Sequence, residues 1–252
     1  MKPALHAEWT KLRTSPGTIW LLLGVVVATV AVGGATVATL GCQPGICAVD
    51  PTKLSLTGVQ LGQAVVAILA VLVIGGEYST GLVHTSLAAV PRRPALLAAK
   101  AIVLAGVVLA AAAPAVLASL LVSGPILAAR GVSVPSLVDG SVLRAAIGSV
   151  LYLTLVALLS LGVATALRNP ATAIGVVLGL LYVIPILVGV VSDPDWKRHL
   201  EQLGPMSAGL AVQVTSHLDD LPIGPWAGLG VLAGWAGAAL LCGGLLLQFR
   251  DA

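Results

Sequence analysis

The stretch that decides the fold is VLVIGGEYSTGLVHTSLAAVPRRPALLAAK, residues 71–100. Its centre carries charged and polar side chains, whereas the chain before and after it is almost continuously apolar. The whole chain follows this pattern: 58% of its 252 residues are hydrophobic and only 9% are charged, with a mean hydropathy of +1.05. Soluble domains usually carry about 25% charged residues. The composition therefore predicts a single membrane domain over residues 1–252.

Six apolar runs are long enough to cross a bilayer, because a helix of about 20 residues spans the hydrocarbon core. They lie near residues 18–40, 59–76, 95–122, 143–167, 171–191 and 226–247. Pro114 in the third run and Pro185 in the fifth predict a kink or tilt in those helices. The sequence thus predicts an all-α polytopic membrane protein with six transmembrane helices.

The charges between these runs predict an orientation. Segments on the N-terminal side hold eight Lys and Arg against three Asp and Glu, and segments on the other side hold five against seven. The two sides therefore carry net charges of +5 and −2, which sum to the formal charge of +3. Basic residues favour the cytoplasmic side, so both termini are expected in the cytoplasm. Since no basic run exceeds the Arg92–Arg93 pair, nucleic acid is not an expected partner.

Residues 3–16, PALHAEWTKLRTSP, predict a helix that lies in the membrane interface. Leu5, Trp9 and Leu12 recur at helical spacing, whereas Glu8, Lys11 and Arg13 are polar. Trp9 suits headgroup depth. The alternative is a plain charged tail that only orients the first span.

The polar segments offer little for catalysis or metal binding. The four histidines fall in separate segments on both sides of the membrane, and no HExxH, GxSxG or carboxylate-pair motif occurs. Cys42 and Cys47 bracket a Pro-Gly turn in an outer loop, where they form either a disulfide or two free thiols. We therefore expect no catalytic residue, no metal ligand and no cofactor-binding residue in this chain.

The six spans carry charged residues only at their ends, whereas ion-coupled carriers usually keep ionisable residues inside the membrane. The chain also lacks GxxxxGK[ST], the loop that cradles ATP phosphates. If the chain transports a solute, its energy is expected from a separate ATPase. Gly175-x-x-x-Gly179 and Gly230-x-x-x-Gly234 permit close helix contact, and packing within the bundle is the favoured interpretation over dimerisation.

The polar part of the opening stretch has its own physical interpretation. Gly75-Gly76 is expected to end the second span, and a short helix is expected within residues 77–90 before Pro91 stops it. One side of it would be apolar, which suits docking into a groove on a cytoplasmic partner. The alternative is an ordinary basic inner loop.

The chain resembles the membrane subunits of type-2 ABC transporters, especially short actinobacterial six-span permeases. The resemblance covers essentially the whole chain and is carried by AEWTKLRTSP, GGEYSTGLVHTSLAAVPRRPALLAAKA, LGVATALRNPATAIGV, LGPMSAG and PWAGLGVLAGWA. E-Y-x-x-G followed by L-x-x-x-P-R-R is its most specific part.

The resemblance implies a coupling helix within 77–90 that contacts the nucleotide-binding subunit, and short outer helices within 196–222. On this basis, and from the amphipathic spacing above, the expected ATPase-coupling residues are Glu77, Tyr78, Leu82, His84 and Leu87. The implied partners are an ABC ATPase, which would bind ATP and Mg²⁺, a second permease copy or homologous permease, and the lipid bilayer.

The implied function is export of a hydrophobic or amphipathic compound across a bacterial cell membrane, with this permease forming half of the path. Drugs, natural products, lipids and peptides all fit, and antibiotic resistance is one role that such export serves. Two alternatives stay open. One is a non-transport assembly or sensor subunit that docks a cytoplasmic partner, and the other is a channel or ion-coupled carrier.

Overall fold

The computed structural model describes residues 2–39, 50–80, 93–132 and 134–249. All regular structure in these residues is helical. Six helices are long and apolar enough to cross a membrane, which confirms the predicted all-α polytopic class. They are α2 (Pro16–Thr39), α4 (Val59–Thr80), α6 (Arg93–Ala129), α7 (Gly140–Leu167), the run of α8 (Pro170–Leu178), η1 (Gly179–Val183) and α9 (Ile184–Val190), and α12 (Pro225–Phe249).

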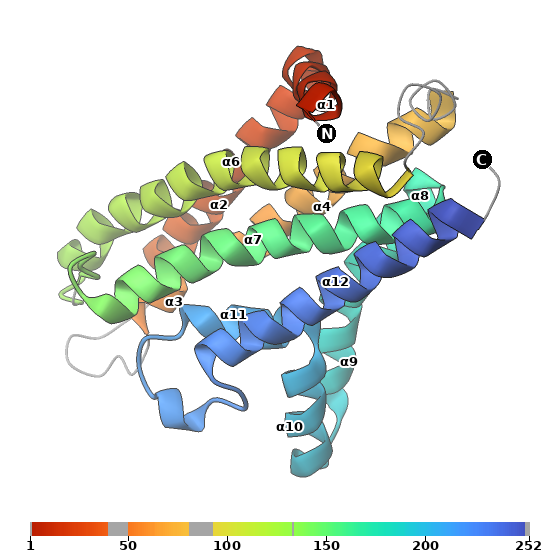
Figure 1. Cartoon of the computed structure of the whole chain (residues 1–252). Helices are drawn as coiled ribbons and strands as arrows, with labels where there is room; N and C mark the ends of the chain where they lie inside the picture. Colours follow the sequence, from red (N-terminus) through yellow and green to blue (C-terminus); the bar gives the residue numbers. More distant parts are fainter. Residues whose placement is uncertain (1, 40–49, 81–92, 133, 250–252) are drawn as a thin grey trace.

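Shorter helices flank this bundle at both ends (Figure 1). The first, α1 (Lys2–Thr14), precedes the first span and lies across the end at which α4 stops and α6 begins; we call this the α1 end. We call the opposite end, where α3 (Pro51–Ser55) lies, the α3 end. Between spans five and six come α10 (Pro194–Leu203), α11 (Pro205–Leu210), η2 (Ala211–Gln213) and η3 (Leu218–Asp220). The predicted N-terminal helix and the predicted short helices between spans five and six are therefore present.

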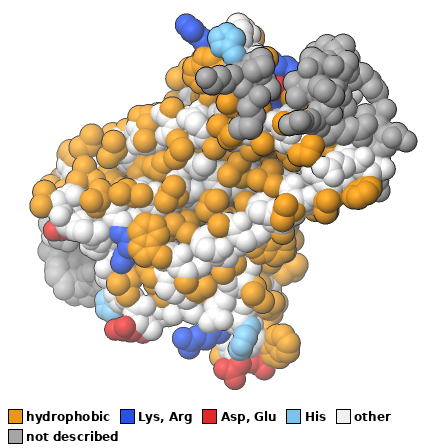
Figure 2. Space-filling model, viewed as in Figure 1, with side chains coloured by type: hydrophobic (Ala, Val, Ile, Leu, Met, Phe, Trp, Pro, Cys, Tyr) orange, Lys and Arg blue, Asp and Glu red, His pale blue; other side chains and the backbone are white. Residues whose placement is uncertain are grey.

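The core of the bundle is built around α7, which packs against α12, α4, α6 and α8. Tyr152 of α7 is its largest fully buried side chain, and its hydroxyl donates a hydrogen bond to Gln63 Oε1 of α4. Most other surfaces of the long helices are apolar and exposed, as expected for helices that face lipid. On the face seen in Figure 2, hydrophobic side chains form a broad band and charged side chains lie toward its ends.

Three of the spans differ in detail from the sequence-based expectation. The second span does not end at Gly75-Gly76, because α4 continues unbroken to Thr80. The third span extends from Arg93 to Ala129 and includes both Pro114 and a further proline, Pro125. In the fifth span the irregularity expected near Pro185 takes the form of a π-helical turn at Gly179–Val183.

Close helix contact occurs at other glycines than the expected ones. Among the described residues, a Cβ atom placed on Gly175, Gly179, Gly230 or Gly234 would have no neighbour within 4 Å. The expectation that these glycines mediate packing within the bundle is therefore wrong. Two of the close approaches are instead at Gly58, against Thr29 of α2, and at Gly162, against Ala239 and Leu240 of α12.

Candidate functional site

The most buried group of charges lies at the α1 end, around the last turn of α4. Glu77 belongs to this turn and is only 3% exposed. The turn lies close to the start of α8, because a Cβ atom on Gly75 would come within 2.7 Å of Pro170 Cβ. Glu77 therefore occupies a closely packed position inside the bundle, at the end of the long helix that leads into residues 81–92.

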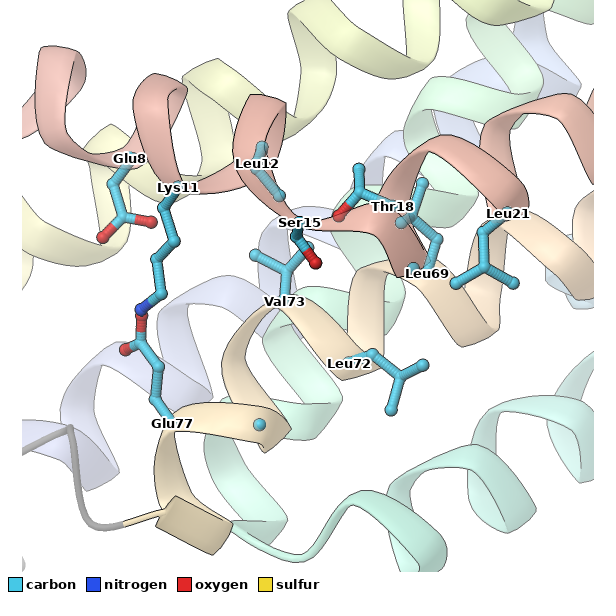
Figure 3. Close-up of a pocket in the computed structure, with 12 residues that line it drawn as sticks. Glu8, Lys11, Leu12, Ser15, Thr18, Leu21, Leu69, Leu72, Val73 and Glu77 are labelled. Carbon is cyan, nitrogen blue, oxygen red and sulfur yellow. The ribbon is translucent and has the colours of Figure 1, made fainter.

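Lys100 of α6 holds this carboxylate. Its side chain is 1% exposed, and its Nζ atom donates to Glu77 Oε1 at 2.5 Å and to Glu8 Oε2 of α1 at 2.8 Å. Lys11 of α1 also pairs with Glu77, as Figure 3 shows. We call Glu8, Lys11, Glu77 and Lys100 the charge cluster; its two carboxylates and two ammonium groups sum to zero charge.

The burial of this cluster has a mechanical consequence. A buried charge is tolerated when it is paired, and removing one partner leaves an uncompensated charge at high cost. Glu8, Glu77 and Lys100 come from three different helices, so separating any two of these helices would expose or unpair a charge. The cluster therefore ties α1, the end of α4 and the start of α6 into one unit.

A second set of contacts ties the same turn to the other side of the bundle. The guanidinium carbon of Arg168 lies 5.9 Å from the centre of the Tyr78 ring, within the range of a cation–π interaction. Arg168 is the C-cap of α7 and adopts the left-handed conformation with φ of 58°. Its Nη2 atom donates to Leu246 O of α12 at 3.4 Å. The last turn of α4 thus contacts α7 as well as α1 and α6.

The site matches a known family. Residues 4–186 match the family described as "ABC-2 family transporter protein", and this match covers well over half of the chain. The chain belongs to the ABC-2 transporter family. It is a multi-pass membrane protein and the membrane subunit of an ABC transporter. The matched region of this ABC-2 subunit contains the whole charge cluster and ends within α9. No curated protein matches the chain.

The structure brings together only some of the site residues predicted from sequence. Glu77 and Tyr78 lie in the last turn of α4, which corrects their expected place at the entry of a separate short helix. Leu82, His84 and Leu87 lie outside the described residues, as do Cys42 and Cys47.

The predicted N-terminal helix is present as α1, and the side that packs against the bundle is not purely apolar. Trp9 is 49% exposed and Arg13 is exposed, whereas Leu12 is buried together with Glu8. The face of α1 that is directed at the bundle therefore combines a charged and an apolar side chain, because Glu8 pairs with Lys100 and Leu12 is also buried. Trp9 does not pack into the bundle, and its place at headgroup depth stays a prediction.

Sequence reasoning missed Glu8 and Lys100 as members of the site. Glu8 was assigned only to the polar side of residues 3–16, and Lys100 was counted only as a basic residue at the start of the third span. A signal was available: Lys100 lies about two helical turns inside the apolar third helix, and an ionisable residue at such a position calls for a partner.

The ABC-2 subunit carries a second polar connection at the α3 end. The carboxylate of Asp50 accepts hydrogen bonds from Thr52 N and Lys53 N at the start of α3, each at 3.1 Å. It also accepts from Thr215 N, from Thr215 Oγ1 at 2.7 Å and from Ser216 N at 3.0 Å. One side chain thus joins the loop before the second span to the segment between spans five and six.

These bonds determine the ionisation of Asp50. Burial raises the pKa of its carboxyl, but the hydrogen bonds from Thr215, Lys53 and Ser216 favour the charged form, and the net pKa lies below the ordinary value of 3.8. The charged form is therefore the one that the fold stabilises. The resulting stability is complete well above pH 3.8 and is lost as the pH falls through 3.8 toward the lower pKa of the folded state.

The substitution Asp50→Asn is expected to lower the free energy of unfolding by about 1–3 kcal/mol at pH 7, because an amide cannot accept all five bonds. The difference from the wild type should shrink as the pH falls below 3.8. Thermal unfolding of the detergent-purified protein across pH measures both effects. Asp139→Asn is the matched control, since Asp139 occupies the N-cap of α7 without a side-chain capping bond. Equal losses in the two variants would contradict the role of Asp50.

Proposed function

We propose that this chain is the permease subunit of an ATP-driven ABC exporter that moves a hydrophobic or amphipathic compound outward across a bacterial cell membrane. It pairs with an ABC ATPase, which supplies ATP and Mg²⁺, and with a second permease that completes the translocation path. Both termini lie in the cytoplasm, so the α1 end faces the ATPase. The family match together with the buried charge cluster beside residues 81–92 supports this proposal most directly.

The proposed mechanism begins at residues 77–90, which contact the ATPase. ATP-driven closure of the two ATPases moves this segment, and a change of state requires contacts that differ between the nucleotide states. Glu77 and Tyr78 lie where the moving segment joins α4. Because Lys100 binds Glu77 and Glu8 together, α1 and α6 move with the end of α4.

The displacement then travels along α4. This helix is continuous over 22 residues, or about 33 Å at 1.5 Å per residue, and so reaches from one end of the bundle to the other. At the α3 end it begins next to α3, which Asp50 joins to residues 215 and 216. A displacement of α4 at the α1 end would therefore also move the segment between spans five and six, where the outer gate is proposed to open.

Replacing Leu82, His84 and Leu87 together by alanine tests this function. These residues lie in the segment proposed to dock the ATPase, so we expect about a tenfold loss of substrate-stimulated ATP hydrolysis, within the usual range of coupling energies. The charge cluster is untouched, so membrane insertion should be normal. The measurement is ATP hydrolysis by the permease co-purified with its ABC ATPase partner, across a panel of amphipathic compounds.

A matched control removes the same kind of side chain from the lipid-facing surface. Leu121 and Leu241 are 67% and 71% exposed, and their joint replacement by alanine should leave stimulation unchanged. Full stimulation after the triple replacement, or equal losses in both variants, would contradict the assignment of 77–90 as the ATPase contact.

A further inference from the structure

A cavity lies between α1, the start of α2 and the last two turns of α4, directly beside the charge cluster (Figure 3). Its volume is about 280 Å³, close to the lower limit of small-molecule sites. One end is bordered by Glu8, Lys11 and Glu77, and the walls are mainly apolar. The apolar wall residues include Leu12, Leu21, Leu69, Leu72 and Val73. The cavity is thus amphipathic, with its charge confined to one end.

The acidic side of the cavity retains unused acceptors. Glu8 binds Lys100 through Oε2 only, and Glu77 binds both lysines through Oε1 only. Within the described residues, the second oxygen of each carboxylate accepts no hydrogen bond. Both side chains are more than nine-tenths buried, so these oxygens lack the full hydration that an exposed carboxylate has. A donor at this end of the cavity would meet two carboxylates that the same Lys100 holds in place.

The two cations of the cluster are not equivalent. Lys100 is 1% exposed and fixed between two carboxylates, whereas the side chain of Lys11 is 43% exposed and holds Glu77 alone. Glu77 keeps Lys100 as its partner when Lys11 leaves, and the Lys11 side chain already reaches water, so Lys11 can turn away at a lower cost than Lys100 could. The remaining group, Glu8, Glu77 and Lys100, then carries one net negative charge. A buried site with a net negative charge favours a cation.

We propose that this cavity binds the ammonium group of a cationic amphiphile, which takes the place of the Lys11 side chain at Glu77 and Glu8. The apolar tail lies along the walls formed by α2 and α4, and the head lies at the level of α1. An anionic head group would instead face the two carboxylates, so the chemistry selects a cation. This binding goes beyond the proposed export function and does not depend on it.

The test uses the full-length permease in a nonionic detergent, without an ATPase, and three probes of equal chain length: decylammonium, decyl sulfate and decanol. Binding is measured by equilibrium dialysis against protein-free micelles. Lys11→Gln is expected to bind decylammonium about fivefold more tightly than the wild type, because it removes the competing cation. Glu8→Gln is expected to weaken decylammonium binding about tenfold, because it removes one carboxylate and leaves the Lys100–Glu77 pair.

The control is Arg13→Gln, which removes the same charge from the same helix at an exposed position away from the cavity. It should leave decylammonium binding within twofold of the wild type, roughly the scatter of surface effects. The proposal is wrong if Lys11→Gln leaves the affinity unchanged or weakens it, if it acts no differently from Arg13→Gln, or if decyl sulfate and decanol bind as tightly as decylammonium. None of these results bears on export, which is measured with the ATPase present.

Two sources can supply such a head group, a free amphiphile or the amino group of a membrane lipid. Nanodiscs of phosphatidylglycerol and of phosphatidylethanolamine distinguish them. Weaker decylammonium binding by the wild type in phosphatidylethanolamine would show that the lipid head group competes for the cavity. Equal binding in both would assign the cavity to free cationic amphiphiles.

Discussion

Replacing Lys100 by methionine is expected to lower the free energy of unfolding by about 3–5 kcal/mol, the usual cost of removing one partner from a buried ion pair. The substitution keeps much of the side-chain length but leaves Glu8 and Glu77 buried without their shared cation. Lys11 can compensate only Glu77, and from an exposed position. The expected loss appears as a lower midpoint in thermal or denaturant unfolding of the purified protein.

A variant with a neutral cluster distinguishes the effect of charge on stability from the effect of packing. Lys100→Met combined with Glu8→Gln and Glu77→Gln removes the buried charges together, and replacing a complete buried ion group is often nearly neutral. The triple variant should therefore recover most of the stability lost in Lys100→Met. If Lys100→Met is as stable as the exposed-site variant Arg13→Gln, the charge cluster does not hold the three helices together.

The positions of the six spans could be predicted from sequence because the bilayer restricts the length and composition of a helix that crosses it. Transmembrane helices must satisfy their own backbone hydrogen bonds over a fixed thickness, so length and hydropathy alone locate all six spans. The ends of the spans depend on tertiary contacts. The second span was expected to end at Gly75-Gly76, with Glu77 just outside it. It continues to Thr80 because Lys100 pairs with the Glu77 carboxylate.

Only the part of the candidate site that lies in one short stretch of sequence, Glu77 and Tyr78, was predicted. Glu77 and Tyr78 stand out because they interrupt an apolar run. Their partners do not, because Glu8 lies 92 residues from Lys100, and Lys100 lies 23 residues from Glu77. Lys100 was counted as one of the basic residues that set the orientation. Nothing in the spacing of these residues indicates that α1 and α6 meet at the end of α4.

The glycines likewise show that close helix packing cannot be read from sequence spacing alone. Gly175 and Gly179 have the spacing of a helix-contact motif, yet their surroundings within the described chain are open. Gly58 has no such motif and lies in the short turn between α3 and α4. The backbone of α2 nevertheless passes so close to it that no side chain fits. Spacing identifies residues that permit close approach, but only the neighbouring atoms show where the approach occurs.

The substitution Gly58→Ala is therefore expected to destabilise the protein by about 3 kcal/mol or more, at the upper end of overpacking effects. The added Cβ atom would lie 1.8 Å from Thr29 O, 2.7 Å from Thr29 C and 2.9 Å from Gly33 N. All three are backbone atoms of α2, so no side chain can rotate to make room. The first span would have to move away from the second, and Ser119 would lose its 2.6 Å hydrogen bond to Ser55 O if the turn moved instead. The measurement is the unfolding midpoint together with the yield of folded, membrane-inserted protein.

Gly106→Ala is the matched control, because a Cβ atom at this position in α6 would meet nothing within 4 Å. Alanine favours a helix over glycine by about 1 kcal/mol, so this variant should be as stable as the wild type or slightly more stable. The contrast assigns the effect to the contact with α2, since both variants add the same methyl group to a glycine. A Gly58→Ala protein that unfolds at the same midpoint as Gly106→Ala would show that the first two spans do not pack as closely as the structure places them.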